Sequence, residues 1–414
     1  MKKKPLFAIP SFPGSNGETD NLRVLKRCGF DAFVFRWNDS LEKLKDVDGY
    51  FFGAGFSYED RGRSGMVAAR DPLFDFIRKE AANGKVVIGN CNGAQVLIES
   101  GLIPLGDGLR MCLAHNAIRD GASWKSPGFL NEWVWITPAC GPDRCATSNW
   151  TGSMHIPIAH GEGRFVTKDK DLIKELEKNN QIAFRYCDAN AVPSADAPTT
   201  PNGSTGGIAG VCNPEGNVVG LMPHPERTEL GDRYFHSVRM WVERSALKSA
   251  AVKKAASQSV IPRVRTPMHT EIFVDTIITN NEERTVEQAA RRNAGTLRLK
   301  QYRYVGLQSD NARELLSSLS FFNPHKEIAY VRTRGAFCKW NADSRKLEQC
   351  SHAVLKGVSL LRRDEPDTRG AALGKGVETG VCYDCRDISE QQLLVSDICE
   401  VFCNPHSSSL ERIA

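Results

Sequence analysis

The chain has 414 residues, a formal net charge of +5, 41% hydrophobic residues and 25% charged residues. At roughly 150 residues per domain, this length predicts two or three domains with cores of their own. The ordinary composition excludes a disordered or fibrous protein, and the small net charge, without a stripe of Lys and Arg interleaved with aromatic residues, indicates no nucleic-acid binding.

Compartment can be inferred from hydropathy and from cysteine usage. No apolar run approaches the roughly 20 residues that a membrane span requires, and Pro10 and Pro13 interrupt the stretch after the amino-terminal lysines before a secretory signal can form. The 13 cysteines are odd in number and spread along the chain, which suits free thiols in a reducing compartment. We therefore expect a cytoplasmic protein without membrane association or structural disulfides.

The amino-terminal part alternates β-rich runs with helical patterns. Buried strands are predicted at Leu6–Ile9, Asp31–Trp37, Gly49–Phe52 and Lys85–Gly89. Helices are predicted at Asp20–Cys28, which stops at Gly29, and at Asp71–Ala82, with an Asp cap and Pro72 at the first helical position. This order predicts an α/β fold with a parallel sheet and helices on both faces, whose ligands bind at the carboxyl ends of the strands.

The last of these strands runs directly into a helical pattern with Cys91 at the turn and Gly89 and Gly93 on either side. A sharp strand-to-helix corner needs small neighbours and pushes its central side chain out above the sheet, as in a nucleophile elbow. The helix N-terminus also favours the thiolate, which is the reactive form. Cys91 is therefore a candidate nucleophile, and the alternative is a buried core cysteine.

A candidate base follows a second buried run. Residues 217–222 predict a strand, and the sequence Pro-His-Pro-Glu-Arg comes directly after it. His224 is stiffened by prolines on both sides, and Glu226 stands two residues later, so a carboxylate can orient the imidazole. The alternative is an ordinary loop histidine.

A glycine-rich turn, Gly-Ala-Gly-Phe-Ser-Tyr at 53–58, follows the strand that ends at Phe52. Backbone N–H groups near Gly55 are candidates for holding the oxyanion that forms when a thiolate attacks an amide carbonyl. The alternative is a plain strand-to-helix turn.

Seven segments in the amino-terminal part match motifs of one known family and occur in the same order as in that family. They are Phe-Pro-Gly-Ser-Asn at 12–16, Gly-Phe-Ser-Tyr at 55–58, Gly-Asn-Cys-Asn-Gly-Ala-Gln at 89–95, Ile-Pro-Ile-Ala-His-Gly-Glu-Gly-Arg-Phe at 156–165, Pro-Asn-Gly-Ser at 201–204, Ile-Ala-Gly-Val-Cys-Asn at 208–213 and Gly-Leu-Met-Pro-His-Pro-Glu-Arg at 220–227. With them the chain resembles the class I glutamine amidotransferases, of flavodoxin-like fold, and more narrowly the glutaminase subunits of phosphoribosylformylglycinamidine synthase. It departs from that family at Ala54 and Glu59, where glycines are expected, and over residues 107–150.

The resemblance implies that Cys91 attacks the side-chain amide of glutamine and that His224, oriented by Glu226, moves the protons. It also implies that backbone N–H groups at Asn92 and near Gly55 hold the oxyanion. Gln95, four residues past the nucleophile, is expected to help bind the substrate.

The same resemblance implies a partner. The products would be glutamate and ammonia, and no Gly-x-x-x-x-Gly-Lys-[Ser/Thr] loop occurs in the chain. We therefore expect no cofactor in this chain, with ATP and Mg on a separate large synthetase subunit (PurL-like). The alternatives are a glutaminase subunit for a different synthetase and a non-catalytic scaffold.

Composition changes near residue 250. The stretch 246–264 is rich in Ala, Ser and Lys and contains Pro262, which predicts the end of a helix and a linker. We expect an amidotransferase domain at 1–245, a linker at 246–262 and two modules at 263–335 and 336–414.

The second region shows its own pattern of elements. Strands are predicted at His269–Thr279 and Leu297–Leu307, and helices at Glu283–Asn293 and Asn311–Phe321. Phe-Phe-Asn-Pro-His at 321–325 and Phe-Cys-Asn-Pro-His at 402–406 indicate an internal duplication, with chance similarity as the alternative. Both modules resemble PurS, the small subunit of the same synthase, which forms dimers and bridges the glutaminase and the synthetase.

Four cysteines near the end of the chain suggest a second kind of site. Cys382, Cys385, Cys399 and Cys403 stand near the spacing of a zinc site. Since Cys399 and Cys403 lie one helical turn apart, the alternative is a set of core cysteines, and we expect no metal.

Overall fold

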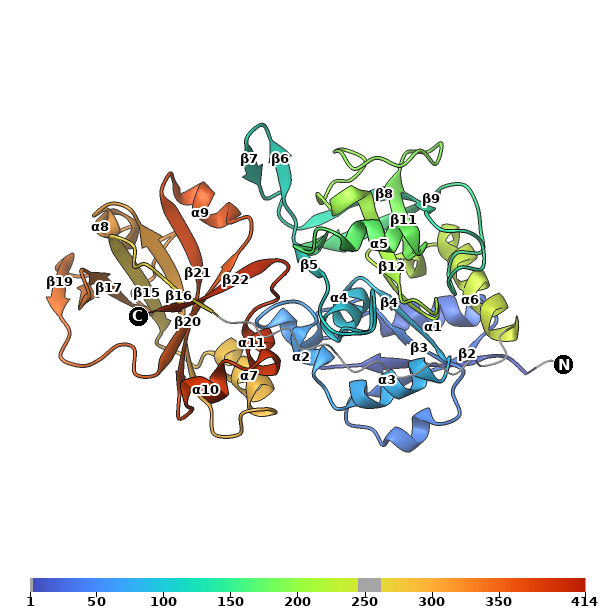
Figure 1. The fold of residues 1–414 in the computed structure, drawn as a ribbon, viewed down its shortest axis with the longest axis horizontal. Helices are drawn as coiled ribbons and strands as arrows, with labels where there is room; N and C mark the ends of the chain where they lie inside the picture. The colour runs from blue at the N-terminus through green and yellow to red at the C-terminus, as the bar shows by residue number, and fades with distance from the viewer. Residues whose placement is uncertain (1–2, 245–261, 414) are drawn as a thin grey trace. The chain divides into compact units, whose positions relative to one another are not determined.

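The computed structural model describes residues 3–244 and 262–413. The chain divides into two compact units, Met1–Ala256 and Ser257–Ala414, which are shown in Figure 1 and described separately. The predicted linker at 246–262 lies outside the described residues except for Pro262. None of the described helices is both long and apolar enough to cross a membrane.

The first unit is built on one large mixed sheet. Its strand order is β2 (Asp31–Arg36), β1 (Leu6–Ser11), β3 (Gly49–Phe52), β4 (Val86–Asn90), β13 (Val218–Leu221), β12 (Ile208–Cys212), β11 (Ile182–Cys187), β8 (Leu130–Pro138), β9 (Met154–His160). Neighbours from β2 to β13 pair in parallel, and those from β13 to β9 pair antiparallel. The predicted parallel sheet is confirmed for the first group, and the antiparallel extension is an addition that the sequence pattern did not predict.

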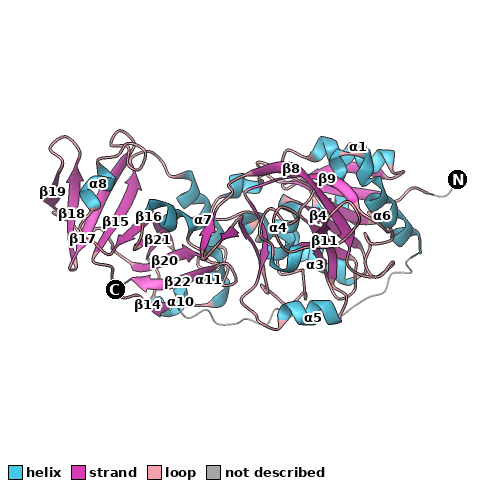
Figure 2. Cartoon of the chain, turned by 90° about the horizontal axis from the view of Figure 1, so that it is seen from above, coloured by secondary structure: helices cyan, strands magenta, loops and turns pink. Residues whose placement is uncertain are grey.

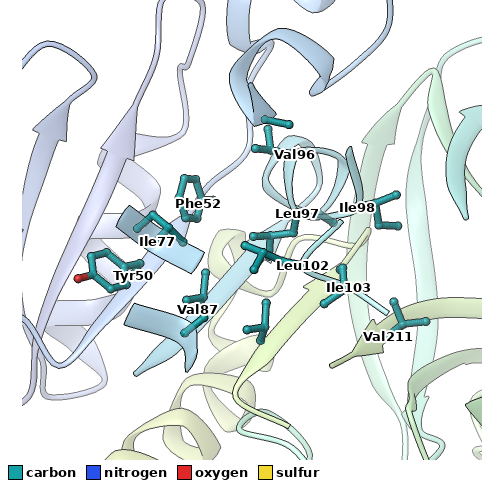
Figure 3. Close-up of a cluster of buried hydrophobic side chains, with 14 of the residues drawn as sticks. Tyr50, Phe52, Ile77, Val87, Val96, Leu97, Ile98, Leu102, Ile103 and Val211 are labelled. Atoms are coloured by element: carbon teal, nitrogen blue, oxygen red, sulfur yellow. The ribbon is translucent and has the colours of Figure 1, made fainter. Parts of the chain in front are cut away.

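Helices cover both faces of this sheet, as predicted. Figure 2 shows them on opposite sides of the strands. On one face lie α1 (Glu18–Arg27) and α6 (Asp232–Arg244), whose apolar residues join one core cluster. On the other face lie α3 (Leu73–Ala82), α4 (Asn92–Glu99) and α5 (Leu172–Lys178), which share a second cluster. Figure 3 shows the second cluster, in which Phe52 and Val87 of the sheet meet Ile77 and Leu97 of the helices. Strands covered on both faces are apolar along their whole length, which explains the continuous runs in the sequence.

Shorter elements complete the first unit. They are α2 (Met66–Ala69), the paired strands β5 (Cys112–His115) and β10 (Glu162–Val166), the hairpin β6 (Ile118–Asp120) and β7 (Ser123–Lys125), and the turns η1 (Leu41–Leu44), η2 (Ser57–Asp60), η3 (Thr205–Gly207), η4 (Pro225–Arg227) and η5 (Glu229–Gly231).

The second unit also contains one large sheet, with helices α7 (Asn281–Arg291), α8 (Ala312–Leu316), α9 (Thr368–Leu373), α10 (Glu390–Leu393) and α11 (Ser396–Phe402). Its strand order is β14 (Arg263–Val264), β22 (Ser408–Ile413), β20 (Val358–Asp364), β21 (Val377–Arg386), β16 (Arg298–Leu307), β15 (Thr270–Thr276), β17 (Glu327–Thr333), β18 (Ala336–Asn341), β19 (Lys346–Gln349). The helix predicted to reach Phe321 ends at Leu316, because the following Ser-Ser-Leu-Ser favours turns over helix. This unit is the α+β region predicted to follow the first domain.

The sheet of the second unit consists of two similar halves. In each half the first strand lies between the second and the third: β15 between β16 and β17, and β20 between β21 and β22. The two second strands, β16 and β21, pair antiparallel along their whole length, from Arg298 opposite Arg386 to Leu307 opposite Val377. The hairpin of β18 and β19 pairs with β17, so the sheet joins residues 336–349 to the first half, whereas the predicted boundary assigned them to the second.

The two Asn-Pro phrases adopt the same turn. Asn323 Oδ1 accepts a hydrogen bond from the backbone N–H of His325 at 3.0 Å, and Asn404 Oδ1 accepts one from His406 at 3.0 Å. Each turn leads into the third strand of its half. Equivalent placement in two halves of equal topology favours duplication over chance similarity.

The zinc alternative does not fit this unit. Cys382 and Cys385 lie on β21 an odd number of residues apart, so their side chains point to opposite faces of the sheet. Cys399 Sγ contacts the carbonyl oxygen of Leu393 at 3.6 Å, and Cys403 Sγ contacts Ser408 Oγ at 3.2 Å. Within the described ranges, no three His, Cys, Asp or Glu side chains are grouped to hold a metal ion, and these cysteines are core residues.

Candidate active site

Cys91 lies between β4 and α4 with φ 51° and ψ −109°, a strained conformation for a residue with a side chain. Its backbone N–H donates to Leu221 of β13 at 2.8 Å, and the N–H of Gly93 donates to Gly53 at 3.1 Å. A Cβ atom at Gly93 would collide with the carbonyl group of Phe52. The structure thus contains the sharp strand-to-helix corner that the two flanking glycines predicted.

His224 reaches Cys91 because of strand order. β13 pairs in parallel with β4, with Leu221 opposite Asn90, so the residues after both strands meet at one edge of the sheet. His224 Nδ1 lies 2.6 Å from Glu226 Oε1, and Asn90 Nδ2 donates to Glu226 Oε2 at 3.0 Å. The Tyr234 hydroxyl donates to Asn90 Oδ1 at 3.2 Å, so the carboxylate is supported by a chain of buried hydrogen bonds.

The electrostatics of this group favour a charged histidine. Burial acts to lower the pKa of His224, but the charges of Cys91 and Glu226 outweigh it and raise the pKa to about 10. For Glu226, burial acts to raise the pKa, and the interaction with His224 lowers it further than burial raises it. The arrangement is a buried carboxylate that holds an imidazolium beside the sulfur of a cysteine.

The residues predicted to hold the oxyanion lie next to the nucleophile. Asn92 begins α4, where the backbone N–H groups of the first turn have no partner within the helix. Gly55 lines the cavity at Cys91 and has φ +144°, and a Cβ there would lie 2.9 Å from the backbone N of Asn16. Glycine is therefore required at this approach of two backbone segments, and Ala54 is accommodated with 4% exposure.

Cys91 opens into a cavity of about 150 Å³. The predicted substrate residue Gln95 lines it, but the Gln95 side-chain amide is held by the protein: Nε2 donates to the Glu162 carbonyl oxygen at 2.6 Å, and Oε1 accepts from Asn92 Nδ2 at 3.0 Å. Polar residues that no motif argument had assigned also line it, among them Asp60, His160 and Glu162. The segments at 55–58 and 156–165 pointed to these neighbourhoods, but only the fold brings them together.

The η2 turn explains one departure from the family pattern. Tyr58, Glu59 and Asp60 have φ values of 52°, 57° and 53°, in the left-handed region where glycine is favoured. Glu59 therefore occupies a position where the expected glycine would be free of strain.

The fold and the site define a class of protein: an α/β protein that brings a cysteine, a histidine and a carboxylate together at the carboxyl ends of parallel strands. Residues 4–248 match the family described as the CobB/CobQ-like glutamine amidotransferase domain. PurQ, a subunit of phosphoribosylformylglycinamidine synthase, from Methanothrix thermoacetophila is 44% identical over 224 residues, which are 53% of this chain and 86% of that protein. PurQ from Pyrococcus furiosus is 35% identical over 57% of this chain and 98% of its own length.

A solved structure, that of PurLQS from Thermotoga maritima, is similar with a TM-score of 0.45 and 31% identity, over 58% of this chain and 99% of that one. On the family match and the sequence relatives, the chain belongs to the CobB/CobQ-like glutamine amidotransferases and, within them, to the PurQ family.

Replacing Glu59 by glycine should stabilise the first unit. A left-handed residue with a side chain costs about 1 kcal/mol, and the exposed ion pair of Glu59 with Arg61 at 2.9 Å contributes little. Because glycine also gains freedom in the unfolded chain, we expect Glu59→Gly to raise the free energy of unfolding by about 0.5 kcal/mol, measured by urea denaturation. Glu59→Ala, which keeps the Cβ atom, is the control, and an equal gain in that variant would contradict the strain argument.

Removing the charge of Glu226 should change how the reactivity of Cys91 depends on pH. Because the Glu226 carboxylate helps raise the pKa of His224 to about 10, Glu226→Gln should release the imidazole proton at a lower pH and so remove positive charge from beside the Cys91 sulfur. We expect iodoacetamide to alkylate Cys91 about tenfold more slowly than in wild type near neutral pH, one pKa unit being a factor of ten. The difference should close as the pH approaches 10, where wild-type His224 also loses its proton. Peptide mass analysis isolates Cys91 from the other thiols, and superimposable pH profiles would rule this coupling out.

Proposed function

We propose that this chain is the glutaminase component of phosphoribosylformylglycinamidine synthase, in de novo purine biosynthesis. It hydrolyses glutamine to glutamate and delivers ammonia to a separate ATP-dependent synthetase chain. The observation that carries this proposal is the strained Cys91 beside the buried pair of His224 and Glu226, in a chain that belongs to the PurQ family.

In the proposed mechanism, the Cys91 thiolate adds to the side-chain amide carbon of glutamine, and the N–H groups of Asn92 and the Gly55 turn hold the oxyanion. The His224 imidazolium gives its proton to the departing nitrogen, which leaves as ammonia, and a thioester remains. His224 is then neutral and takes a proton from water as the water attacks the thioester, which frees glutamate and returns the proton to the thiol–imidazole pair. Glu226 fixes the ring orientation throughout.

The fate of the ammonia indicates what kind of partner this chain needs. Ammonia that escapes into water is protonated and is no longer a nucleophile, so the glutaminase must be closed off and joined to the site that consumes its product. A PurL-like synthetase is the proposed partner, and it would carry ATP and Mg. A glutaminase serving a different synthetase is the second candidate, and the acceptor that accelerates glutamine hydrolysis separates the two.

We infer a bridging role for the second unit. Its two halves, joined by β16 and β21, are arranged as a dimer of a small subunit would be, which supports two PurS-like modules. We place them at 263–335 and 336–414, except that the hairpin of β18 and β19 goes with the first module. This part of the sequence offers no constellation of candidate catalytic groups, which is consistent with a docking role. For a biosynthetic subunit of this kind we propose a cytoplasmic location.

Cys91→Ser should reduce synthesis from glutamine by the assembled enzyme and leave synthesis from added ammonium salt unchanged. Serine lacks the acidity of the thiol, so glutamine-dependent synthesis should fall at least about a thousandfold. Synthesis from added ammonium salt should stay unchanged, because the synthetase site lies on another chain. Both rates are measured by ADP release with the purified partner, and equal loss of both would count against Cys91 as the nucleophile. Cys28→Ser, a core cysteine without contact to the site, is the matched control.

Deleting residues 250–414 should uncouple the glutaminase from its partner. The first unit is compact by itself, so the shortened chain is expected to fold and to keep the alkylation rate of Cys91. It should show low basal glutaminase activity that the synthetase no longer stimulates. Retained stimulation and retained complex formation in size-exclusion chromatography would assign the second unit another role.

A further inference from the structure

Three cysteines that have no part in the proposed chemical steps gather at one end of the first unit's sheet. Cys140 follows β8 and Cys212 is the last residue of β12, and these strands lie on either side of β11. Cys140 Sγ approaches the carbonyl oxygen of Ala183 at 3.9 Å, and the backbone N–H of Cys212 donates to Gln181 at 2.9 Å. The thiol of Cys145 interacts with those of both Cys140 and Cys212, so three sulfur atoms meet there.

A tight turn places Cys140 beside Cys145. The backbone N–H of Arg144 donates to the carbonyl oxygen three residues earlier at 3.2 Å, and Asp143 has φ 60°. Pro142 stands at the second position of this turn, and a proline followed by a left-handed residue is the pattern of a type II turn. Residues that face each other across a hairpin have Cα atoms about 4.5–5.5 Å apart, which is within the range of a disulfide.

Strand spacing makes Cys145 the shared partner of the other two thiols. Neighbouring strands lie about 4.8 Å apart, so β8 and β12, with β11 between them, are separated by about 10 Å. A disulfide spans Cα separations of up to roughly 7 Å, so Cys140 and Cys212 are not placed to pair with each other. Cys145 and Cys212 are fully buried, whereas Cys140 is half-buried. Cys140 is therefore the thiol that a small oxidant or reductant meets first.

The contacts prepare Cys145 to act as a nucleophile. Its interactions with Cys140 and Cys212, together with the Thr147 hydroxyl at 3.5 Å, lower the pKa of Cys145 against the effect of burial. The same contact with Cys145 raises the pKa of Cys140 and that of Cys212. A thiolate is the form that attacks a sulfenic acid or a disulfide, so negative charge is directed to the one sulfur that has a partner across the turn.

We propose that Cys140 and Cys145 form an oxidation site, at which a peroxide converts the two thiols to a disulfide that thiol reductants reverse. Cys140 passes its proton to the Cys145 sulfur and attacks one peroxide oxygen. The O–O bond breaks, and the other oxygen leaves as hydroxide, which takes the proton and becomes water. Cys145 then attacks the Cys140 sulfenic acid, the S–O bond breaks, and the second oxygen leaves as hydroxide. The two electrons that the sulfurs lose reduce one peroxide, and transient disulfides of this kind occur in reducing compartments.

The site is connected to the carboxylate that orients the imidazole of the active site. Thr147, whose hydroxyl contacts Cys145, also interacts with Tyr234. The Tyr234 hydroxyl donates to Asn90, which in turn donates to Glu226. A disulfide sulfur has no proton to donate and carries no negative charge, so oxidation changes the hydrogen bonds at Thr147. Oxidation should therefore disturb the support of Glu226 and slow the reactions of the nucleophile.

The test follows the link between two tryptic peptides of the full chain. Because trypsin cleaves after Arg144, the peptides that carry Cys140 and Cys145 stay joined only through a disulfide. After brief treatment with hydrogen peroxide, and iodoacetamide to block the remaining thiols, peptide mass analysis should show the joined pair, and dithiothreitol should abolish it. Cys140→Ser should give no joined pair, and the control Cys28→Ser should give as much as wild type. A wild-type chain without the pair, or one that joins Cys145 to Cys212, overturns the proposal.

A second measurement tests the connection to Cys91. Since peroxide can also oxidise Cys91 to its sulfenic acid, the treated chain is exposed to arsenite, which reduces sulfenic acids and leaves disulfides intact. Iodoacetamide should then alkylate Cys91 about fivefold more slowly than in untreated chain, at the lower end of typical couplings between sites, and dithiothreitol should restore the rate. Cys140→Ser taken through the same steps should react at its untreated rate. Equal slowing in that variant, or no slowing in wild type, would overturn the connection to the active site.

Discussion

The strained backbone of Cys91 is the constraint on which the rest of the first unit depends. A left-handed residue of this kind costs about 1–3 kcal/mol and persists only where its surroundings over-determine it. Here the surroundings are three parallel strands and a helix: β13 accepts the N–H of Cys91, and the turn after β3 accepts the N–H of Gly93. A Cβ atom at Gly89 would lie 2.6 Å from the backbone of Gly93, and one at Gly93 would collide with the carbonyl group of Phe52, so neither position can carry a side chain without a shift. The position of the thiol is therefore a property of the sheet, and a change in strand packing would move the nucleophile.

The same sheet carries a buried charged pair that would be costly alone. His224 and Glu226 are almost fully buried, and breaking such a pair typically costs about 3–5 kcal/mol because one charge is left uncompensated. Asn90 and Tyr234 satisfy the carboxylate through a chain of hydrogen bonds. Since Tyr234 belongs to α6, these hydrogen bonds tie that helix to the edge of the sheet where Glu226 lies. Stability and catalysis thus draw on the same buried contacts.

Features that depend on a few neighbouring residues could be predicted from the sequence, and features that depend on tertiary contacts could not. The strands before Cys91 and the glycines around it are local patterns, and they predicted the elbow. The position of His224 after a strand next to β4 could be predicted, because a buried strand and two prolines mark it within a few residues. Asp60 and Glu162 were missed since their meeting depends on the pairing of β10 with β5 and on a left-handed turn at 58–60, neither of which leaves a periodic signal. The antiparallel strands were missed for a similar reason: apolar runs predict strands, but only tertiary contacts fix their direction. The zinc alternative for the four cysteines does not fit because side chains alternate between the two faces of β21, which puts Cys382 and Cys385 on opposite faces. This conflict can be seen only once the segment is known to be a strand.

The second unit resembles a symmetric pair whose two halves are joined in one chain. In a symmetric dimer, the two partners of a ladder such as β16 with β21 must be identical. Covalent connection removes this requirement while keeping the pairing. Val305 and Asp384 occupy equivalent positions in the ladder, yet the Asp384 carboxylate accepts hydrogen bonds from the backbone at Lys356 and Gly357, which a valine cannot do. One half continues into β18 and β19, and the other pairs with β14. The two outer edges of the sheet are consequently different surfaces, and a bridging unit with unlike edges can contact two unlike neighbours where a symmetric dimer presents the same edge twice.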